Sequence, residues 1–175
     1  MLEQQHTHRV AVEADLPAIV AIYNETIASR LVTADLEPVS IDSRRAWFAD
    51  HRRATRPLWV VEQQDATVAW LSFSSFYGRP AYEGTAEVSV YVAGRARRRG
   101  IATHLLCAAA AAAPQLGLRT LLGFIFGHNE PSLQLFARSG YEKWGRLPRV
   151  AWLDGVERDL VIVGRRIAGA AGSQA

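Results

Sequence analysis

The chain has 175 residues, 49% of them hydrophobic, which is enough for one domain with a sizeable core and short for two. No apolar run approaches the roughly 20 residues of a membrane span, and the polar start Met1 to Arg9 lacks a signal-peptide core, so we expect a soluble, cytoplasmic protein. The net charge is only +3, and the single cysteine, Cys107, cannot form an internal disulfide. A membrane protein and a disulfide-stapled domain are thereby disfavoured.

The chain begins with the pattern of a short strand and an amphipathic helix. Residues 10–12 predict the strand. Asp15 as N-cap and Pro17 in the first turn predict a helix from Leu16 to about Ala28. Apolar side chains recur along it at helical spacing, so we expect one buried face, made of Leu16, Ile19, Val20, Tyr23 and Ile27.

A long loop and a second helix follow. Residues 29–41 show no periodicity and include Pro38, which predicts a loop of the kind that often forms a lid. Ser40 or Asp42 can cap a helix over residues 43–52, with Trp47 and Phe48 on its apolar side. We interpret the arginines of this region as a solvated surface; they are Arg44, Arg45, Arg52, Arg53 and Arg56.

Three strands occupy the middle of the chain. Residues 58–62 and 67–75 read as a hairpin with a polar turn, and Glu87 to Val92 alternates with period two. The intervening loop, residues 76–84, contains aromatic side chains and Arg79. We expect Arg79 near the Glu87 end of the third strand, where a guanidinium could bind a carboxylate bidentately. A solvent-exposed loop arginine is the alternative.

The turn after this strand has the chemistry of a phosphate cradle. Gly100 lies where the strand gives way to an Ala-rich helix, predicted over residues 103–113, in which we expect Cys107 to be buried. A glycine there lets the backbone approach a ligand, and the free N–H groups of the first helical turn attract an anion. An arginine cluster coincides with this turn, so an anionic ligand explains it without nucleic acid; a solvated loop is the alternative. The cluster is Arg95, Arg97, Arg98 and Arg99.

The last third of the chain predicts a buried strand over residues 119–126, a helix opening at Asn129 and closing near Arg138, and strand patterns up to residue 163. We expect a flexible start at residues 1–8, one domain over residues 9–167 and a disordered tail at residues 168–175.

The hexapeptide from Arg97 to Ala102 resembles the (Gln/Arg)-x-x-Gly-x-(Gly/Ala) signature with which the GNAT superfamily of N-acetyltransferases holds the pyrophosphate of acetyl-CoA. The strand, helix, strand and helix around it are similar to the acetyl-CoA half of that fold, and Glu87 to Val92 resembles the phosphinothricin or methionine sulfoximine acetyltransferase branch. The resemblance extends from Val10 to Ile167. It implies one α/β (α+β) domain with a mixed, mostly antiparallel sheet of about seven strands, splayed between the fourth and fifth and flanked by about four helices. A homodimer is plausible, because dimers are common in this branch.

The resemblance also implies where acetyl-CoA binds. Its pyrophosphate would meet backbone N–H groups from Arg98 to Thr103, and its pantetheine arm would lie along the strand that carries Val90 and Val92. Asn129 resembles the residue that hydrogen-bonds the pantetheine, although a helix-capping role is an equal alternative. The full set of cofactor candidates is Val90, Val92, Arg97, Arg98, Arg99, Gly100, Ile101, Ala102, Thr103, Asn129 and Ser132.

Three residues are candidates for catalysis. Glu87 matches a glutamate of the branch and could accept the proton of the acceptor amine if partial burial raises its pKa. A β-bulge would free the backbone N–H of Val90 or Tyr91 to stabilise the oxyanion. Phe136 stands where many family members place a proton-donating tyrosine, so either the thiolate leaves unassisted or Tyr91 or His128 protonates it. The candidates for contacting the acceptor are Tyr23, Arg79, Tyr82 and Glu87.

We therefore expect an acetyl-CoA-dependent N-acetyltransferase that acetylates the α-amine of a small amino acid or a glutamate-like analogue (phosphinothricin, methionine sulfoximine or methionine sulfone) by direct transfer in a ternary complex. The alternatives are another amine (a peptide N-terminus, a polyamine or an antibiotic) and a non-catalytic acyl-CoA- or nucleic-acid-binding module. We expect no metal, because the five histidines lack ligand spacing beyond the His6 and His8 pair, and neither a nucleic-acid nor a membrane partner.

Overall fold

Seven strands form one mixed sheet in the computed structural model, which describes residues 6–51 and 54–168. The strand order is β1-β2-β3-β4-β5-β7-β6, and every neighbouring pair is antiparallel except β4 with β5. This arrangement confirms the predicted fold class. The strands are β1 (Arg9–Val10), β2 (Leu58–Gln63), β3 (Ala66–Ser75), β4 (Thr85–Val92), β5 (Thr120–Phe126), β6 (Glu142–Leu153) and β7 (Val156–Arg166).

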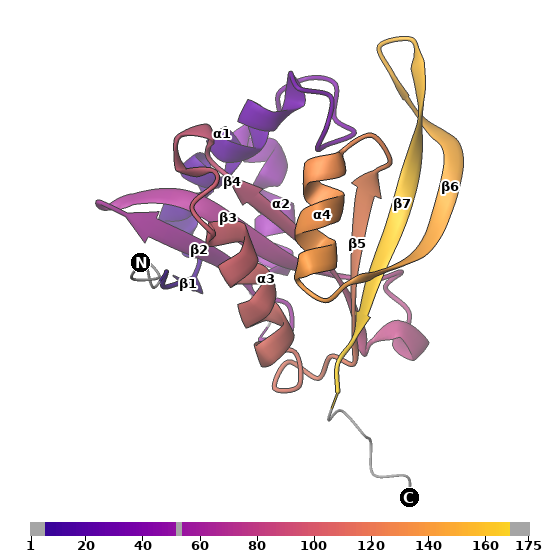
Figure 1. Ribbon diagram of the computed structural model, residues 1–175. Helices are drawn as coiled ribbons and strands as arrows, with labels where there is room; N and C mark the ends of the chain where they lie inside the picture. Colours follow the sequence, from indigo (N-terminus) through magenta and orange to yellow (C-terminus); the bar gives the residue numbers. More distant parts are fainter. Residues whose placement is uncertain (1–5, 52–53, 169–175) are drawn as a thin grey trace, which may run out of the picture.

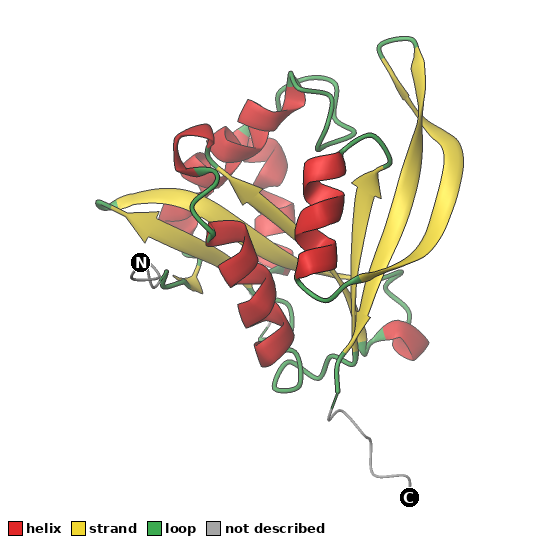
Figure 2. Ribbon diagram, in the orientation of Figure 1, coloured by secondary structure: helices red, strands yellow, loops and turns green. Residues whose placement is uncertain are grey.

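Four α-helices cover the two faces of this sheet, and each face has its own core (Figures 1 and 2). One face carries α3 and α4, packed over side chains that include Phe73, Leu105 and Leu121. The opposite face carries α1 and α2, packed over a smaller cluster around Leu16 and Trp70. The helices are α1 (Leu16–Ile27), α2 (Ile41–Asp50), α3 (Ile101–Ala112) and α4 (Glu130–Arg138).

The sheet opens between β4 and β5. These parallel strands pair only from Thr85 to Glu87, opposite Thr120 to Leu122, and then diverge. The predicted splay is therefore present, and its mouth lies beside the first turn of α3 (Figure 1). Beyond Glu87, the edge of β4 that faces β5 has backbone groups without a strand partner, so a ligand can take their place.

The predicted β-bulge in β4 is absent from its pairing with β3, where the register runs regularly from Ala69↔Val92 to Ser75↔Ala86. The Ala93 N–H donates to the Val68 carbonyl, so Tyr91, two residues earlier, also directs its N–H toward β3. By the same alternation the N–H of Val90 faces the gap. Divergence of β5, rather than a bulge, thus leaves donors free on this edge of β4, and of the two predicted candidates Val90 is the one that faces the gap.

The first strand and helix differ in detail from the prediction. The strand ends at Val10 instead of Val12, because a short 3₁₀ turn over Glu13–Asp15 already leads into α1. The carboxylate of Asp15 does not cap α1; it accepts bonds from the Val12 N–H at 2.7 Å and from the Arg9 guanidinium at 2.7 and 2.8 Å. An ion pair between the half-exposed Arg9 and the buried carboxylate of Asp15 therefore replaces the expected cap.

Other expectations need smaller corrections. Ser40 does cap α2, accepting from the Ser43 N–H at 3.1 Å. Cys107 is exposed, since it lies on the solvent side of α3. The strand patterns over residues 141–153 merge into one long strand, β6, and the pattern at residues 160–163 is part of β7. The predicted end of α2 at residue 52, most of the flexible start and nearly all of the tail lie outside the described residues; of the start, His6 and His8 contact α3.

Candidate active site

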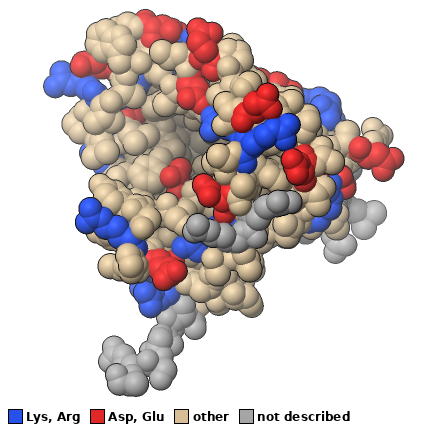
Figure 3. Space-filling view, turned by 180° about the vertical axis from the view of Figure 1, so that it is seen from behind, with Lys and Arg blue, Asp and Glu red and all other residues tan. Residues whose placement is uncertain are grey.

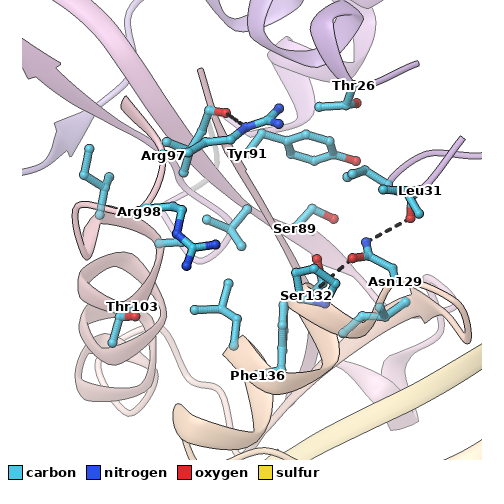
Figure 4. Close-up of a pocket in the computed structure, with 18 of the residues that line it drawn as sticks. Thr26, Leu31, Ser89, Tyr91, Arg97, Arg98, Thr103, Asn129, Ser132 and Phe136 are labelled. Carbon is cyan, nitrogen blue, oxygen red and sulfur yellow. Dashed lines mark hydrogen bonds between the residues drawn. The ribbon is translucent and has the colours of Figure 1, made fainter. Parts of the chain in front are cut away.

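The splay opens into a cleft of about 430 Å³, which we call the splay cleft (Figure 4). Its walls come from β4 on one side and from β5 and α4 on the other, and the first turn of α3 closes one end. Every predicted cofactor residue except Arg99 lines it. Those residues are Val90, Val92, Arg97, Arg98, Gly100, Ile101, Ala102, Thr103, Asn129 and Ser132.

The turn before α3 is shaped to receive an anion. Gly100 is the N-cap of α3 and has φ +81°, a left-handed conformation that costs a glycine little, and Arg98 has φ +62°. The first intrahelical bond runs from the His104 N–H to the Gly100 carbonyl, so the N–H groups of Ile101, Ala102 and Thr103 have no helical acceptor. We call this turn, residues 97–103, the cradle. Its free donors and cationic side chains fit a pyrophosphate.

Two arginines of the cradle, Arg97 and Arg99, make different contacts. The Arg97 Nε donates to the Val92 carbonyl at 3.2 Å, which ties the cradle to the end of β4. Arg99 lies outside the splay cleft, and its carbonyl accepts a bond from His6 Nε2 at 2.7 Å. The N-terminal segment therefore braces the outside of the cradle, and the prediction that Arg99 contacts the cofactor has no support from the lining of the cleft.

Asn129 combines a structural role with a place in the cleft. Its Oδ1 accepts from the Ser132 N–H at 3.2 Å, which caps α4, and its Nδ2 donates to the Leu31 carbonyl at 2.9 Å. The side chain is only 4% exposed, yet it lines the splay cleft (Figure 4). His128 similarly holds the same loop through Nε2 and the Arg30 carbonyl at 2.9 Å. The loop after α1 is thus fastened to the start of α4 and forms part of the wall of the cleft, which Leu31 lines.

A second cavity, of about 190 Å³, lies on the other face of the sheet between β3, β4, α1 and α2; we call it the rear cavity. Seen from behind, the surface is hollowed near its middle, with acidic and basic side chains intermixed around the hollow (Figure 3). The two cavities share Ser89 and Tyr91, so they meet at β4. The full lining of the rear cavity is Ile19, Val20, Tyr23, Val39, Arg44, Trp47, Trp70, Ser72, Ser74, Glu87, Ser89 and Tyr91.

Glu87 lies in the rear cavity, close to the point where the two cavities meet. It lines the rear cavity, and burial raises the pKa of its carboxyl, opposed by a weak hydrogen bond from Ser89 Oγ at 3.4 Å. On β4 it lies two residues before Ser89, so both side chains project from the same face. A carboxylate with a raised pKa beside a cavity fits the chemistry of a general base.

Tyr91 and Phe136 decide which side chain could protonate the CoA thiolate that we expect as the leaving group. Tyr91 stacks on Trp70 with ring centroids 4.3 Å apart, and burial raises its pKa, so its hydroxyl stays protonated. Phe136 is 4% exposed and packs its ring against Tyr141 beside the splay cleft. His128 does not line the cleft. Of the two predicted donors, only Tyr91 therefore faces this space.

The acceptor candidates divide into two groups. Tyr23 and Glu87 line the rear cavity, and the Tyr23 hydroxyl donates to Asp35 Oδ2 at 2.6 Å and is hydrogen-bonded to Thr33. Arg79 and Tyr82 are exposed on the loop between β3 and β4 and line neither cavity, although Tyr82 packs against neighbouring aromatic rings. The structure thus brings two of the four together.

Sequence reasoning missed Arg44, which lines the rear cavity although we interpreted its region as a solvated surface. That interpretation is wrong for Arg44, whose side chain is 27% exposed, and for Arg56, which is 6% exposed. It also overlooked Trp70, Ser72 and Ser74, which alternate along β3 on the cavity side. Two serines at period two in an apolar strand were a readable signal of a polar pocket.

His51 supports one wall of the rear cavity. Its Nδ1 donates to the Trp47 carbonyl at 2.7 Å, which leaves Nε2 to accept from Ser74 Oγ at 3.3 Å. The ring is 6% exposed, and burial lowers its pKa, which favours the neutral form that this arrangement needs. Ser74 is the cross-strand neighbour of Glu87, so His51 fastens the end of α2 beside the carboxylate.

In the ranges 6–51 and 54–168 no group of three or more His, Cys, Asp or Glu side chains is arranged to hold a metal ion. Over the same ranges, none of the helices combines the length and the apolar character needed to cross a bilayer.

The splay cleft, which ends in the cradle, and the rear cavity, which holds the half-buried carboxylate of Glu87, meet at Ser89 and Tyr91 on β4. The chain belongs to the acetyltransferase (GNAT) family, whose model matches residues 19–141, and within it to the phosphinothricin and methionine sulfoximine acetyltransferase branch. It is therefore an acetyltransferase.

Curated relatives support this placement. YwnH of Bacillus subtilis (strain 168), assigned provisionally as a phosphinothricin acetyltransferase, is 52% identical over 163 residues, which cover 93% of this chain and 99% of that protein. The L-methionine sulfoximine/L-methionine sulfone acetyltransferase of Pseudomonas aeruginosa is 36% identical over 150 residues, which cover 81% of this chain and 86% of the relative.

A solved structure shows the same fold with a ligand. The phosphinothricin acetyltransferase of Sinorhizobium meliloti, crystallised in complex with acetyl-CoA, has a TM-score of 0.87 and is 28% identical, with 93% of this chain and 88% of that chain aligned. The predicted family, fold and enzyme class are thereby confirmed.

Proposed function

We propose that this enzyme transfers the acetyl group of acetyl-CoA to the α-amine of a small amino acid or a glutamate-like analogue such as phosphinothricin, methionine sulfoximine or methionine sulfone. The observation that carries the proposal is that the splay cleft and the rear cavity meet at Ser89 and Tyr91, beside Glu87. The cradle suits a pyrophosphate, and the rear cavity, at about 190 Å³, suits a compact acceptor better than a peptide or an extended polyamine. The curated relatives of the branch act on compounds of this size.

The residues have complementary roles in this proposal. When bound, acetyl-CoA supplies an activated acetyl group in the splay cleft. Glu87 takes a proton from the ammonium of the acceptor, directly or through a water, and so frees the amine to attack. The Val90 N–H donates to the carbonyl oxygen on which negative charge develops. As the C–N bond forms and the C–S bond breaks, Tyr91 donates its hydroxyl proton to the departing sulfur. The phenolate left on Tyr91 then takes the second proton that the acylated nitrogen must lose, directly or through a water.

The same arrangement supports direct transfer within a ternary complex. Neither cavity is lined by a cysteine, and Cys107 lies exposed on α3, so no thiol stands where it could carry the acetyl group. Among the described residues the hydroxyl of Ser89 makes no hydrogen bond to a histidine; its one hydrogen bond there is to Glu87.

Release of free CoA thiol tests this function. The panel contains phosphinothricin, methionine sulfoximine, methionine sulfone, common amino acids, a polyamine and short peptides. We expect turnover with the free amino acids and the glutamate-like analogues. Turnover restricted to the polyamine or the peptides would contradict the proposed acceptor, and absence of both turnover and acetyl-CoA binding would contradict the cofactor.

Replacing Tyr91 with Phe tests the proton donor. We expect turnover to fall by about 10²-fold, the lower limit of what one positioned acid contributes, while the stacking on Trp70 persists because the ring is kept. Stopped-flow measurement of the chemical step would check this. An unchanged rate would mean that the thiolate leaves unassisted.

We also propose that the enzyme is a homodimer. Large apolar side chains are exposed on the hairpin of β6 and β7, including Leu147, Val150 and Trp152, the last 64% exposed. Such a patch is a candidate for burial between subunits. Light scattering should return twice the 19.3 kDa chain mass, and a value near 19.3 kDa at micromolar concentration would contradict the dimer.

A further inference from the structure

We propose that His6 is a positioning residue for acetyl-CoA, because it holds the peptide between Arg99 and Gly100 in the orientation that turns a backbone N–H toward the splay cleft. The inference rests on the proposed function, since it takes the cradle as the place where the pyrophosphate binds. His6 lines neither the splay cleft nor the rear cavity, so it acts on the cofactor through this peptide and not by contact.

The contact that carries the inference is a hydrogen bond on the outer side of the cradle. His6 Nε2 donates to the Arg99 carbonyl at 2.7 Å, and the imidazole is the donor because a carbonyl oxygen can only accept. The peptide after Arg99 is trans, so its carbonyl and the N–H of Gly100 point in opposite directions. Arg99 lies outside the splay cleft and Gly100 lines it. The bond that holds the carbonyl outward therefore directs the Gly100 N–H inward.

The N–H of Gly100 is available to a ligand. It makes no hydrogen bond among the residues that the structure describes, and the free N–H groups of Ile101, Ala102 and Thr103 follow it. A glycine accepts either sign of φ, so without the bond from His6 this peptide could turn over at little steric cost. A donor that is fixed before the ligand arrives loses less conformational entropy on binding. The imidazole thus prepares the first donor of the cradle.

A cluster of three imidazoles keeps His6 at this place. The ring of His8 lies with its centre 4.4 Å from that of Trp59 on β2, and its Nδ1 is hydrogen-bonded to His104 Nε2 at 3.2 Å. The rings of His6 and His104 meet edge to face with centres 5.9 Å apart. Burial lowers the pKa of His8 and of His104, which favours the neutral imidazole that their hydrogen bond needs as its acceptor. The segment that carries His6 is therefore fastened to β2 and to the first turn of α3.

Isothermal titration with acetyl-CoA tests the inference, and two substitutions of His6 separate its hydrogen bond from the rest of the side chain. His6→Phe keeps a ring against His104 but has no donor, and we expect it to weaken acetyl-CoA binding by about threefold to tenfold, the effect of one net hydrogen bond. His6→Gln places an amide N–H near the position of Nε2 and should bind within about twofold of the wild type. The matched control is Thr7→Ala, because Thr7 is exposed and lines neither cavity; it should bind as the wild type does.

Steady-state kinetics give a second readout. His6 does not touch the reacting atoms, so His6→Phe should raise the KM for acetyl-CoA by about threefold to tenfold and leave kcat at saturating acetyl-CoA unchanged. A side chain that only stabilised the fold would instead change the melting temperature and leave this KM as it is.

Several outcomes would overturn the inference. They are equal affinities of His6→Phe and the wild type for acetyl-CoA, a loss in His6→Gln as large as that in His6→Phe, or a loss of the same size in Thr7→Ala. Wild-type enzyme that binds acetyl-CoA but acetylates none of the amines in the panel would contradict the proposed acceptor, while the titrations still decide the role of His6. Wild-type enzyme that does not bind acetyl-CoA would contradict both.

Discussion

Replacing Glu87 with Gln should lower turnover by about 10²-fold or more, the contribution typical of a positioned general base. The amide keeps the size of the side chain and its place in the rear cavity but cannot accept the proton of the acceptor. Steady-state kinetics with saturating acetyl-CoA would measure the loss. Glu83→Gln is the matched control, because Glu83 is exposed on the loop before β4 and lines neither cavity, and it should retain wild-type turnover.

The pH dependence of kcat/KM and of thermal stability gives a second test of the role of Glu87. Burial raises the pKa of Glu87 above its ordinary value of 4.5, so kcat/KM of the wild type should fall as the pH drops through this raised pKa. The same shift means that the folded protein binds a proton more tightly than the unfolded chain, so ionised Glu87 disfavours the folded state at neutral pH. Glu87→Gln should therefore melt at or above the wild-type temperature at pH 8, and this difference should vanish as the pH falls below 4.5. Wild-type turnover in the variant, or a lower melting temperature at pH 8, would contradict this account.

Replacing Gly100 with Val should weaken acetyl-CoA binding by roughly tenfold or more. A left-handed residue with a Cβ costs about 1–2 kcal/mol, and a tenfold change in affinity corresponds to about 1.4 kcal/mol. A Cβ at Gly100 would meet only His6 Nε2, at 3.9 Å, so the fold has room for it, but the cradle must shift its free N–H groups to relieve the backbone strain. Isothermal titration with acetyl-CoA measures the effect.

Gly117→Val is the matched control for the cradle. Gly117 follows the other end of α3 with φ +71° and open space around it, so valine there imposes similar strain far from the splay cleft. Both variants should lose thermal stability, and only Gly100→Val should lose affinity for acetyl-CoA. Equal affinities in the two variants would show that the cradle does not hold the cofactor.

The sequence predicted best where function depends on consecutive residues. The strand, the cradle and the first turn of α3 lie within residues 85–103, so their arrangement follows from local propensities and one left-handed glycine. The same holds for Asn129, whose role as a cap is local. Almost every cofactor candidate from these segments lines the splay cleft.

Features that depend on distant contacts were harder to predict. Arg44 faces the rear cavity because α2 packs against α1 and β3, and nothing within α2 distinguishes Arg44 from its exposed neighbour Arg45. Cys107 was expected to be buried but is exposed. Small apolar side chains lie on both faces of the Ala-rich helix α3, so its sequence does not show which face is buried. The free donor of Val90 arises from the divergence of β5, a strand that begins 30 residues later, and not from a bulge in β4 itself.

Initial rates measured while acetyl-CoA and methionine sulfone are both varied test the central claim, that both substrates occupy adjoining cavities at once. We predict double-reciprocal lines that intersect, because transfer occurs only when the splay cleft and the rear cavity are filled together. Parallel lines, the pattern of a covalent acetyl-enzyme, would contradict direct transfer across β4.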